Sequence, residues 1–593
     1  MSLFFRSGAV AIALVSLAGT VQAQSGSARF PLFSRPSQIV TKSKAIDDGF
    51  SREIVLKLSG NAERLSQDYP DTLMQVAESV HLIPHIGFLR VRLKAGVDIP
   101  AALSRLRTLP QFSGVHPARR VSIVSVPNDS YISSQYALTR MNVFPAWDLW
   151  RPLTEPNKPI IVAGVDTGVL GTHIDLAAKM LRDTSGNIIG YDATTHKPSN
   201  GFGEHWHGTH TAGTMVATIN NGTGVAGIGG WTGEAGVVDT TSIRLMPIRV
   251  LDASGSGGDV EVAEGIVWAT DHGARVINMS LGANDAGLGS TVDNPMYDAT
   301  EYAIAQGVTV VCAAGNNGRD EAFYPASYPG TLSVAATVNN SIDSLAGFSN
   351  RGTRVNVSAP GEGIISTYNN GGYANASGTS MAAPQVAGLV ALLLAQNPTL
   401  SQTRVRSIVI NTVRPYGASS LISPTGGPVD ALRAMNATLA TLATINGTIT
   451  LQGATASAQV LTLNFASTDG SLPFTKTVTL TPQSSGSAIA TFTLPRVLPK
   501  VYTIRLKTPQ HLAKAITFDA TAGGALSLTS LLLAGDVNND NAVDFGDLSK
   551  MLQSYNAFIG DPLYFPAADL NNDGSIDFGD LSLMLQNYNT IGD

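Results

Sequence analysis

The sequence contains few of the residues that would cross-link it or charge it strongly. Cys312 is the single cysteine among 593 residues, so neither a disulfide framework nor a cysteine-based zinc site can form. Because Cys312 lies inside an apolar run, we expect it to be a small buried hydrophobe. Charged residues make up 14% of the chain, and the formal net charge is −6. This balance excludes the basic surface that nucleic-acid binding requires.

Long hydrophobic runs are also scarce. After the N-terminal region, no stretch reaches the roughly 18 apolar residues that a membrane-spanning helix needs, so we expect no membrane span. The first residues combine Arg6, an apolar run at 9–17 and the small-x-small site Val21-Gln22-Ala23. This pattern is typical of a secretory signal peptide, which we place at residues 1–23. The sequence therefore predicts a secreted, extracellular protein.

A chain of this length exceeds one hydrophobic core, and we expect three or more domains. We assign residues 24–126 to an N-terminal segment whose ordered part covers about residues 52–126. Strands are expected there at 54–58, 88–93 and 115–126, and helices at 71–80 and 99–109. Such a mixture predicts a small α+β unit with its own apolar faces.

Apolar strands alternate with helices over residues 127–437. Strands are expected at 160–165, 242–250, 276–279, 308–311, 331–337 and 355–357, and helices at 208–217, 259–272, 298–306 and 383–396. Near-continuous apolar strands interleaved with helices indicate an α/β fold, with a mostly parallel sheet covered by helices on both faces. The functional site of such a sheet lies at the carboxyl ends of its strands.

Two further segments complete the chain. Residues 445–533 are rich in Thr, Ser, Leu and Ala with period-two runs, which predicts a β-sandwich of about seven short strands. It carries no visible chemistry and is either a spacer or interaction domain or a ligand-binding module. Residues 535–593 contain two copies of one loop–helix motif, which begin at Asp536 and Asp569, 33 residues apart.

Three short motifs between residues 165 and 384 carry the chemistry. Asp166 ends an apolar strand, and His207 opens a helix of small residues. Ser380 lies in a Gly-Thr-Ser turn directly before a long apolar run that predicts a buried helix. A serine in the first turn of a helix sits beside free backbone N–H groups, which suits a nucleophile whose reaction builds an oxyanion. The chain order Asp, His, Ser is one of those in which catalytic triads occur.

Each of these residues also has a structural interpretation. Asp166 and Ser380 could be ordinary capping residues. His207 and His210, three residues apart, could form a metal pair, although no Glu follows in the zinc-protease pattern. The presence of all three motifs in one chain favours the catalytic interpretation.

The three motifs together resemble those of the subtilisin family of serine endopeptidases. Two further segments support the resemblance: Ala313-Ala314-Gly315-Asn316 is similar to the family's oxyanion-hole segment, and Ser280-Leu281-Gly282 to the strand edge that pairs with substrate. The resemblance implies that Ser380 attacks the peptide carbonyl, that His207 transfers its proton and that Asp166 orients His207. It also implies that the Asn316 amide and the Ser380 backbone N–H hold the oxyanion, without a catalytic cofactor.

The resemblance further implies where a polypeptide substrate lies. The substrate is expected to add a strand between Ser280-Leu281-Gly282 and the glycine-rich segment around Gly255. The pocket for the residue before the cleaved bond is expected between Ser280, Leu281 and Gly282 on one side and Ala313, Ala314 and Gly315 on the other. Because these walls are small and apolar, we expect a broad preference for apolar or aromatic residues, with Phe323 as a residue that could narrow the pocket.

Calcium is implied as a structural ion, first within residues 127–437. Asp175, nine residues after Asp166, and Asn221, in an Asn-Gly loop, resemble calcium ligands of the family, and Asp129 is a further candidate. Oxygen ligands suit this hard cation. An ordinary Asn-Gly turn is the alternative for the loop.

The two terminal copies present oxygen ligands at positions 1, 3, 5, 9 and 12 of a tight loop. These are Asp536, Asn538, Asp540, Asp544 and Asp547 in the first copy, and Asp569, Asn571, Asp573, Asp577 and Asp580 in the second. The closing Asp and the paired loop–helix form resemble a dockerin, which implies a cohesin-like receptor and attachment to a cell surface or a protein complex. Asn541 departs from the pattern, because position 6 is usually Gly.

The N-terminal α+β unit resembles the family's inhibitory propeptide, which would make the protein a zymogen that cleaves itself near Val126. A retained N-terminal domain is the alternative. For the whole chain, the alternative to an enzyme is an inactive protease-fold adhesion or scaffold protein, against which the complete triad argues. A purely calcium-binding structural protein would leave the three motifs unexplained.

Overall fold

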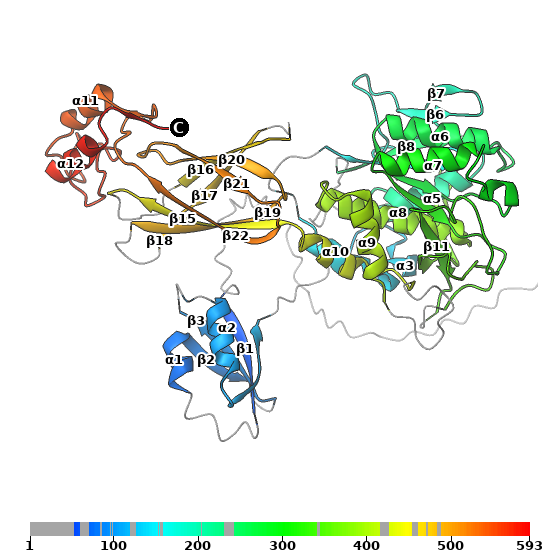
Figure 1. Ribbon diagram of the computed structural model, residues 1–593, viewed down its shortest axis with the longest axis horizontal. Helices are drawn as coiled ribbons and strands as arrows, with labels where there is room; N and C mark the ends of the chain where they lie inside the picture. Colours follow the sequence, from blue (N-terminus) through cyan, green and yellow to red (C-terminus); the bar gives the residue numbers. More distant parts are fainter. Residues whose placement is uncertain are drawn as a thin grey trace, which may run out of the picture. The chain divides into compact units, whose positions relative to one another are not determined.

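The computed structural model (Figure 1) forms two compact units, residues 1–120 and 121–593. It describes residues 52–59, 70–83, 86–94, 97, 99–118, 126–151, 153, 158–202, 204–230, 242–340, 344–414, 426–453, 460–469, 473–482 and 488–593. The expected signal peptide lies outside the described residues, as do residues 24–51.

The first unit is a four-stranded antiparallel sheet of order β2-β3-β1-β4 with two helices. Its elements are β1 (Glu53–Leu58), α1 (Asp71–Val76), β2 (Ala77–Ile83), β3 (Phe88–Leu93), α2 (Ile99–Arg107) and β4 (Phe112–Pro117). This arrangement confirms the α+β class of the unit. The predicted helix at 71–80 was wrong after Val76, because the chain there pairs with β3 as strand β2 and this pairing overrides the helical pattern.

The second unit is built around an eight-stranded sheet of order β12-β11-β10-β9-β5-β8-β6-β7. All neighbours are parallel except β7, which joins the edge antiparallel. The strands are β5 (Ile160–Asp166), β6 (Gly190–Asp192), β7 (Lys197–Ser199), β8 (Ile243–Arg249), β9 (Ala274–Met279), β10 (Thr309–Ala313), β11 (Leu332–Thr337) and β12 (Val357–Pro360). The mostly parallel sheet expected from the sequence is therefore confirmed.

Helices cover both faces of this sheet (Figure 1). They are α3 (Tyr136–Arg140), α4 (Val143–Leu149), α5 (His207–Val216), α6 (Asp259–Asp271), α7 (Pro295–Ala305), α8 (Thr379–Gln396), α9 (Gln402–Asn411) and α10 (Ala431–Leu439), with 3-10 turns η1 (Ile132–Ser134), η2 (Ile228–Gly230) and η3 (Ala286–Gly289). One buried core joins α6 and α7 to the sheet, and the other joins α4, α5, α8, α9 and α10 to its opposite face. A hairpin that the sequence did not predict, β13 (Ile364–Thr367) and β14 (Tyr373–Ala376), follows β12.

Helix α8 has the length and composition of a membrane span, with 18 residues and a mean hydropathy of 1.3. However, 94% of it is buried inside the protein, where it packs in the core with α5, β9, β10 and β11. This burial accounts for its apolar character. Among the described residues it is the one helix that meets these criteria.

A β-sandwich follows α10. One four-stranded sheet has the order β18-β19-β15-β22 and the other the order β17-β16-β20-β21. The strands are β15 (Ala443–Leu451), β16 (Val460–Ser467), β17 (Phe474–Thr479), β18 (Thr481–Pro482), β19 (Ile489–Val497), β20 (Val501–Lys507), β21 (Lys514–Asp519) and β22 (Gly524–Leu532). The inward residues of both sheets form one core around Phe465 and Tyr502. The sandwich contains eight strands in the described part of the chain, one more than expected.

The C-terminal tail packs as a pair of loop–helix copies. Helix α11 (Phe545–Gln553) follows the first loop and α12 (Phe578–Gln586) the second. Short strands β23 (Ala542–Val543) and β24 (Thr590–Ile591) pair antiparallel and connect the first loop to the end of the chain. A small core around Met551, Ile576 and Met584 joins the two copies.

Candidate active site

Asp166 and His207 are brought together at the carboxyl edge of the large sheet. Asp166 is the last residue of β5, and His207 is the first residue of α5. His207 Nδ1 lies 2.8 Å from Asp166 Oδ1 and 3.0 Å from Oδ2. Asp166 is fully buried, whereas the His207 side chain is 17% exposed. The geometry lets Asp166 accept a hydrogen bond from the Nδ1–H of His207 and leaves Nε2 free to act as a base.

Neighbouring threonines and backbone groups hold the Asp166 carboxylate. The Thr167 N–H donates to Oδ1 at 2.7 Å, and the Thr211 hydroxyl donates to Oδ2 at 3.3 Å. Burial by itself lowers the pKa of His207, but the charge of Asp166 and the hydrogen bond to it outweigh burial, so this pKa is raised above its ordinary value. The sequence did not single out these threonines, although both belong to the motifs around Asp166 and His207.

Ser380 is the second residue of α8 and is half-buried. Its Oγ donates to the Ser280 carbonyl at 3.0 Å, and Ser280 Oγ donates back to the Ser380 carbonyl at 2.8 Å. Within the described part of the chain, Ser380 Oγ makes this bond rather than one to His207. The nucleophile is therefore held at the strand edge 280–282, and its hydroxyl must exchange this hydrogen bond for one to His207 before His207 can take its proton.

Asn316 follows β10 and approaches the start of α8. Its Oδ1 accepts from the Thr379 N–H at 2.8 Å and from the Thr379 hydroxyl at 2.9 Å. These bonds occupy the side-chain oxygen, so the exposed amide NH₂ of Asn316 is left to donate beside the turn at Gly378. The structure thus places Asn316 beside Ser380, where an oxyanion donor is expected.

A groove of about 460 Å³ runs beside His207. Residues 254–258 line one part of it and Ser280, Leu281 and Gly282 line another. Gly255 has a positive φ of 81°, and a Cβ there would lie 3.6 Å from His205 Nε2. The two segments that sequence reasoning expected to flank a substrate therefore line one groove.

The expected side-chain pocket contains a residue that the sequence could not place. Ala313 ends β10, Ala314 and Gly315 follow, and both alanines are buried. The ring of Phe323 lies between Gly315 and Gly282. Phe323 therefore occupies space between the two expected walls.

His205 and His210, the two histidines near His207 in sequence, have different environments. His210 is buried, and its Nε2 lies 3.0 Å from the Ile364 carbonyl and 3.1 Å from the Ala374 carbonyl, which ties α5 to the β13–β14 hairpin. Burial lowers its pKa to about 4. His205 lines the groove, and its Nδ1 accepts from the His207 backbone N–H at 3.2 Å. His207 Nδ1 contacts Asp166 and His210 Nε2 contacts backbone carbonyls, so each histidine has a partner other than a metal ion.

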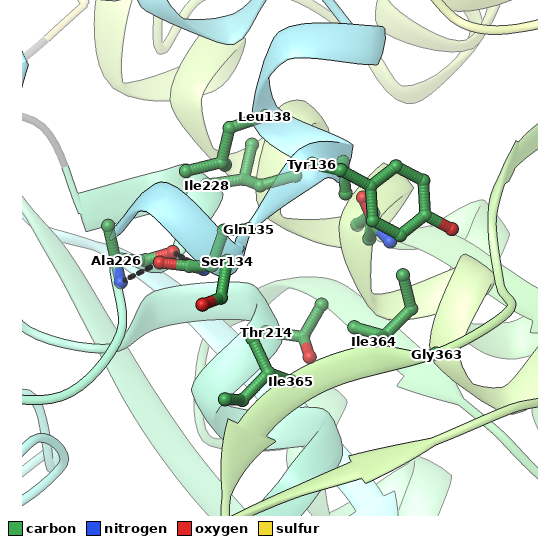
Figure 2. A pocket seen from close by; sticks show the side chains of 12 residues that line it. Ser134, Gln135, Tyr136, Leu138, Thr214, Ala226, Ile228, Gly363, Ile364 and Ile365 are labelled. Atoms are coloured by element: carbon green, nitrogen blue, oxygen red, sulfur yellow. Dashed lines mark hydrogen bonds between the residues drawn. The ribbon is translucent and has the colours of Figure 1, made fainter. Parts of the chain in front are cut away.

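Figure 2 shows a separate small cavity of about 20 Å³ near η1. Gln135 contacts the Ala226 backbone there with both ends of its amide, at 2.8 and 2.9 Å. The cavity has room for about one water molecule. It contains none of the catalytic candidates, so we assign it a structural role.

The loop 220–225 wraps two buried carboxylates. Asn221 Nδ2 donates to Asp175 Oδ1 at 2.7 Å, and the Val225 N–H donates to Asp175 Oδ2 at 2.9 Å. Asp129 Oδ2 accepts from the Asn220 N–H at 3.0 Å, while its Oδ1 is buried without a hydrogen-bond partner among the described residues. Burial raises the pKa of both carboxyl groups. The arrangement fits a cation, because a bound positive charge would offset the cost of burying both carboxylates.

The two tail loops repeat the same contacts. The closing residues Asp547 and Asp580 are buried and accept from the backbone N–H of Asn538 and Asn571 at 2.9 and 3.1 Å. Position 6 has positive φ in both copies, 72° at Asn541 and 94° at Gly574. Asn tolerates this conformation, so the departure at position 6 does not change the loop. Asp536 Oδ1 is buried without a partner in the described part of the chain.

Carboxylates alone do not form these candidate metal sites. No group of three or more His, Cys, Asp or Glu side chains among the described residues could hold a metal ion. To hold calcium, the tail loops would have to add amide and backbone oxygens to their carboxylates.

The chain was compared with known proteins. The model of the subtilase family matches residues 157–462, and that of the dockerin type I domain matches residues 534–588. Thermitase from Thermoactinomyces vulgaris is 39% identical over 287 residues, which cover 48% of this chain and 91% of thermitase. A thermophilic serine proteinase from Bacillus sp. is 38% identical over 305 residues, which cover 51% of this chain and 68% of that protein.

Two further proteins match parts of the chain. An extracellular protease from Xanthomonas campestris is 33% identical over 408 residues, which cover 60% of this chain and 64% of that protein. The crystal structure of fervidolysin from Fervidobacterium pennivorans matches with 24% identity and a TM-score of 0.44, over 81% of this chain and 78% of that one.

The sequence matches define a serine endopeptidase, a hydrolase. The chain belongs to the subtilase family, and it carries a dockerin type I domain near its C-terminus.

Proposed function

We propose that this protein is a secreted serine endopeptidase that hydrolyses peptide bonds through Asp166, His207 and Ser380. The observation that carries the proposal is the contact of 2.8 Å between His207 Nδ1 and the buried Asp166 carboxylate. The same chain presents a serine in the first turn of a buried helix. The relative named as an extracellular protease supports secretion.

The mechanism follows from what each group can donate or accept. Ser380 Oγ attacks the peptide carbonyl carbon while His207 Nε2 takes its proton, and the carbonyl π electrons move to oxygen. The Asn316 NH₂ and the Ser380 N–H donate to this oxyanion. When the C–N bond breaks, His207 gives the proton to the leaving amine, which leaves an acyl-enzyme. Water then attacks the ester in the same way and releases Ser380 and the carboxylic acid product.

Substrate binding would use the groove beside His207. An extended polypeptide would add a strand between Ser280-Leu281-Gly282 and the segment around Gly255. The pocket beside Ala313, Ala314 and Gly315 has apolar walls, which favours apolar residues before the cleaved bond. Small apolar walls are also compatible with a broad preference that includes aromatic residues.

Calcium would be the structural ion. Asp175, Asn221 and Asp129 would supply oxygens around loop 220–225, and the two tail loops would supply theirs from positions 1, 3, 5, 9 and 12. The buried unpartnered oxygens Asp129 Oδ1 and Asp536 Oδ1 support this assignment. Bound calcium would neutralise clustered carboxylates and fix these loops.

We infer the following domain plan: signal peptide 1–23, propeptide 24–126, catalytic domain 127–437, β-sandwich 445–533 and dockerin-like domain 535–593. The propeptide would keep the zymogen inactive until it is cleaved off near Val126. The dockerin domain would attach the enzyme to a cohesin-like receptor on a cell surface or in a protein complex.

Labelling with a fluorophosphonate tests the catalytic assignment. The secreted mature wild type should take up one label at Ser380, located by mass spectrometry of the labelled peptide, and Ser380→Ala should take up none. Absence of label from the folded, calcium-loaded wild type would leave the alternative of an inactive scaffold. Intact-mass measurement of the same sample gives both termini and so tests the predicted cleavage sites.

A further inference from the structure

Phe323 lies between two glycines that belong to opposite walls of the expected side-chain pocket. A Cβ built on Gly282 would lie 2.6 Å from Phe323 Cε1, and one built on Gly315 would lie 2.8 Å from Phe323 Cγ. Both glycines have φ values that other residues rarely adopt, 149° and 100°. The ring therefore contacts the backbone of both walls, at places where a larger residue would not fit.

The backbone on both sides of this ring is fixed. The Phe323 N–H donates to Ser327 Oγ at 3.1 Å, and the Phe323 carbonyl accepts from the Ser327 N–H at 2.9 Å. Tyr324 exchanges two backbone hydrogen bonds with Ala283, of 2.8 and 3.0 Å. Ala283 directly follows the segment 280–282, so the position of Phe323 is tied to the strand edge that is expected to hold substrate.

The turn that follows Gly315 is fixed as well. Gly315 also lies against Asn350, because a Cβ on Gly315 would come within 2.4 Å of Asn350 Nδ2. The Asn350 Oδ1 accepts from the Asn317 N–H at 3.0 Å, which holds the turn after Gly315. The half-buried ring is thus placed between two constrained turns, with part of its surface accessible.

We propose that Phe323 is a specificity-determining residue that closes the far end of the pocket for the side chain before the cleaved bond. The proposal rests on the proposed function and narrows it: small apolar residues such as Ala are preferred there, and aromatic residues are excluded by the volume the ring already fills. An aromatic side chain buries about 150–250 Å², and two such rings cannot share the space between Gly282 and Gly315. A purely structural Phe323 would leave the preference for substrates unchanged when it is replaced.

The test uses the full secreted chain in calcium with a peptide series that differs only at the residue before the cleaved bond, as Ala, Leu or Phe. The wild type should have a kcat/KM for Ala at least ~50-fold higher than for Phe, in the range by which pockets discriminate side chains of different size. Phe323→Gly should raise kcat/KM for the Phe peptide by about 10–100-fold and change that for the Ala peptide by less than about threefold. Phe323→Tyr keeps the ring and should keep the wild-type profile.

The outcomes separate this proposal from the proposed function. A wild type that takes up fluorophosphonate and yet cleaves after Phe as well as after Ala would overturn the role of Phe323. So would a Phe323→Gly variant that is labelled normally and keeps the wild-type ratio. If Phe323→Gly does not fold, Phe323→Leu replaces it. This variant should have a ratio of kcat/KM for the Ala peptide to kcat/KM for the Phe peptide between those expected for wild type and Phe323→Gly. The same ratio measured for the wild type still tests the proposal by itself. A wild type that takes up no label would contradict the catalytic assignment instead.

Discussion

Lys507 and Asp536 form an ion pair between the β-sandwich and the C-terminal tail. Lys507 Nζ lies 2.8 Å from Asp536 Oδ2, and the two side chains are 13% and 0% exposed. Lys507 also donates to Asn539 Oδ1 at 2.7 Å. Asp536 occupies position 1 of the first tail loop, and its Oδ1 has no hydrogen-bond partner within the described residues. One carboxylate oxygen is therefore held by Lys507, while the other remains free to face a cation.

This ion pair predicts a calcium-dependent effect of Lys507→Met. Without calcium, removal of the ammonium leaves a buried carboxylate unpaired, which should lower the local unfolding free energy of the first loop and α11 by about 3 kcal/mol. With calcium bound, the ion compensates the carboxylate, so the loss should be less than half as large. Removal of the nearby positive charge should also tighten calcium binding to this loop.

Hydrogen–deuterium exchange of residues 536–553 measures this local stability, in Ser380→Ala protein with calcium and with a chelator. Lys514→Met is the matched control, because Lys514 pairs with the exposed Asp593 at 3.2 Å and touches no loop ligand. Its effect should not depend on calcium. An equal loss for Lys507→Met in calcium and in chelator would contradict the assignment of Asp536 as a calcium ligand.

The pH dependence of activity should report the pairing of His207 with Asp166. Neutral His207 is the base, so kcat/KM should rise with pH through the pKa of His207, which lies above the ordinary histidine value. Asp166→Asn removes the charge that raises this pKa, while burial continues to lower it. The acid limb should therefore move to lower pH, and kcat should fall by about 10⁴-fold.

Measurement of kcat/KM from pH 5 to pH 10 for both proteins checks this prediction. Thr211→Val is a useful comparison, because it keeps the Asp166 charge and removes a hydroxyl that contacts Asp166 Oδ2 at 3.3 Å and the Gly208 carbonyl at 3.1 Å. It should lower activity far less than Asp166→Asn. An acid limb that stays at the same pH in Asp166→Asn would mean that another group controls it.

The sequence was most informative where a short motif coincides with the end of a strand or helix. Asp166 and His207 were predicted because their positions at the end of an apolar strand and at the start of a helix follow from local pattern. The duplicated tail loops were predicted for the same reason, since each ligand belongs to one run of 12 residues. Local pattern also predicted the order of strands and helices around them.

Features that depend on distant contacts were not predicted. Phe323 was considered as a residue that could narrow the pocket, but nothing near it in sequence indicates that its ring lies against Gly282, because that contact is made by chain folding. The helix expected beyond Val76 is a strand for the same reason, since β3 supplies its partners. Likewise, the bond of Ser380 Oγ to the Ser280 carbonyl joins residues 100 positions apart.

Asn316→Ala should lower kcat strongly and leave KM nearly unchanged. The variant loses a donor to an oxyanion that exists only during the reaction, and in subtilisin the loss of one such donor costs about 10²–10³ in kcat. Thr379→Val should have a smaller effect, because it keeps the Asn316 amide and the backbone bond to Asn316 Oδ1, and removes the hydroxyl bonds of 2.9 Å to Asn316 Oδ1 and of 3.2 Å from the Gly315 N–H. Steady-state kinetics on one peptide measures both. A change in KM alone for Asn316→Ala would place Asn316 in substrate binding instead.

Two buried histidines should weaken the fold in acid. Burial lowers the pKa of His210 and of His511 to about 4. Between the ordinary histidine pKa and about 4, the unfolded chain binds protons that the folded chain does not, so stability falls as the pH falls through this window. Each group contributes up to about 3 kcal/mol of this loss.

The His511 contribution can be isolated, because His511 lies between Thr508 and the Gln452 carbonyl, away from the catalytic residues. His511→Gln in Ser380→Ala protein should reduce the loss of local stability between pH 7 and pH 5 around residues 508–512. Hydrogen–deuterium exchange at both pH values measures it, with the exposed His272→Gln as control. An unchanged loss in His511→Gln would show that His511 does not cause it.

The two copies of the tail present equivalent apolar side chains to solvent. Phe545 and Phe578 occupy the same place in the two loop–helix copies and are 71% and 70% exposed. Leu552 and Leu585 are a second equivalent pair, further along α11 and α12, and they are 53% and 50% exposed. Exposed apolar patches of this kind mark interaction surfaces.

If either copy can engage a cohesin-type receptor, Phe545→Ala alone should weaken binding by less than about threefold, and the double variant with Phe578→Ala should weaken it by about 100-fold or more. Biolayer interferometry against a panel of recombinant cohesin domains measures this, in calcium. Leu563→Ala is the control, because Leu563 is 65% exposed and lies in the segment between the two loop–helix copies. Equal losses for the single and the double variant would mean that only the first copy binds, and wild-type binding to none of the panel would remove cohesin as the receptor class.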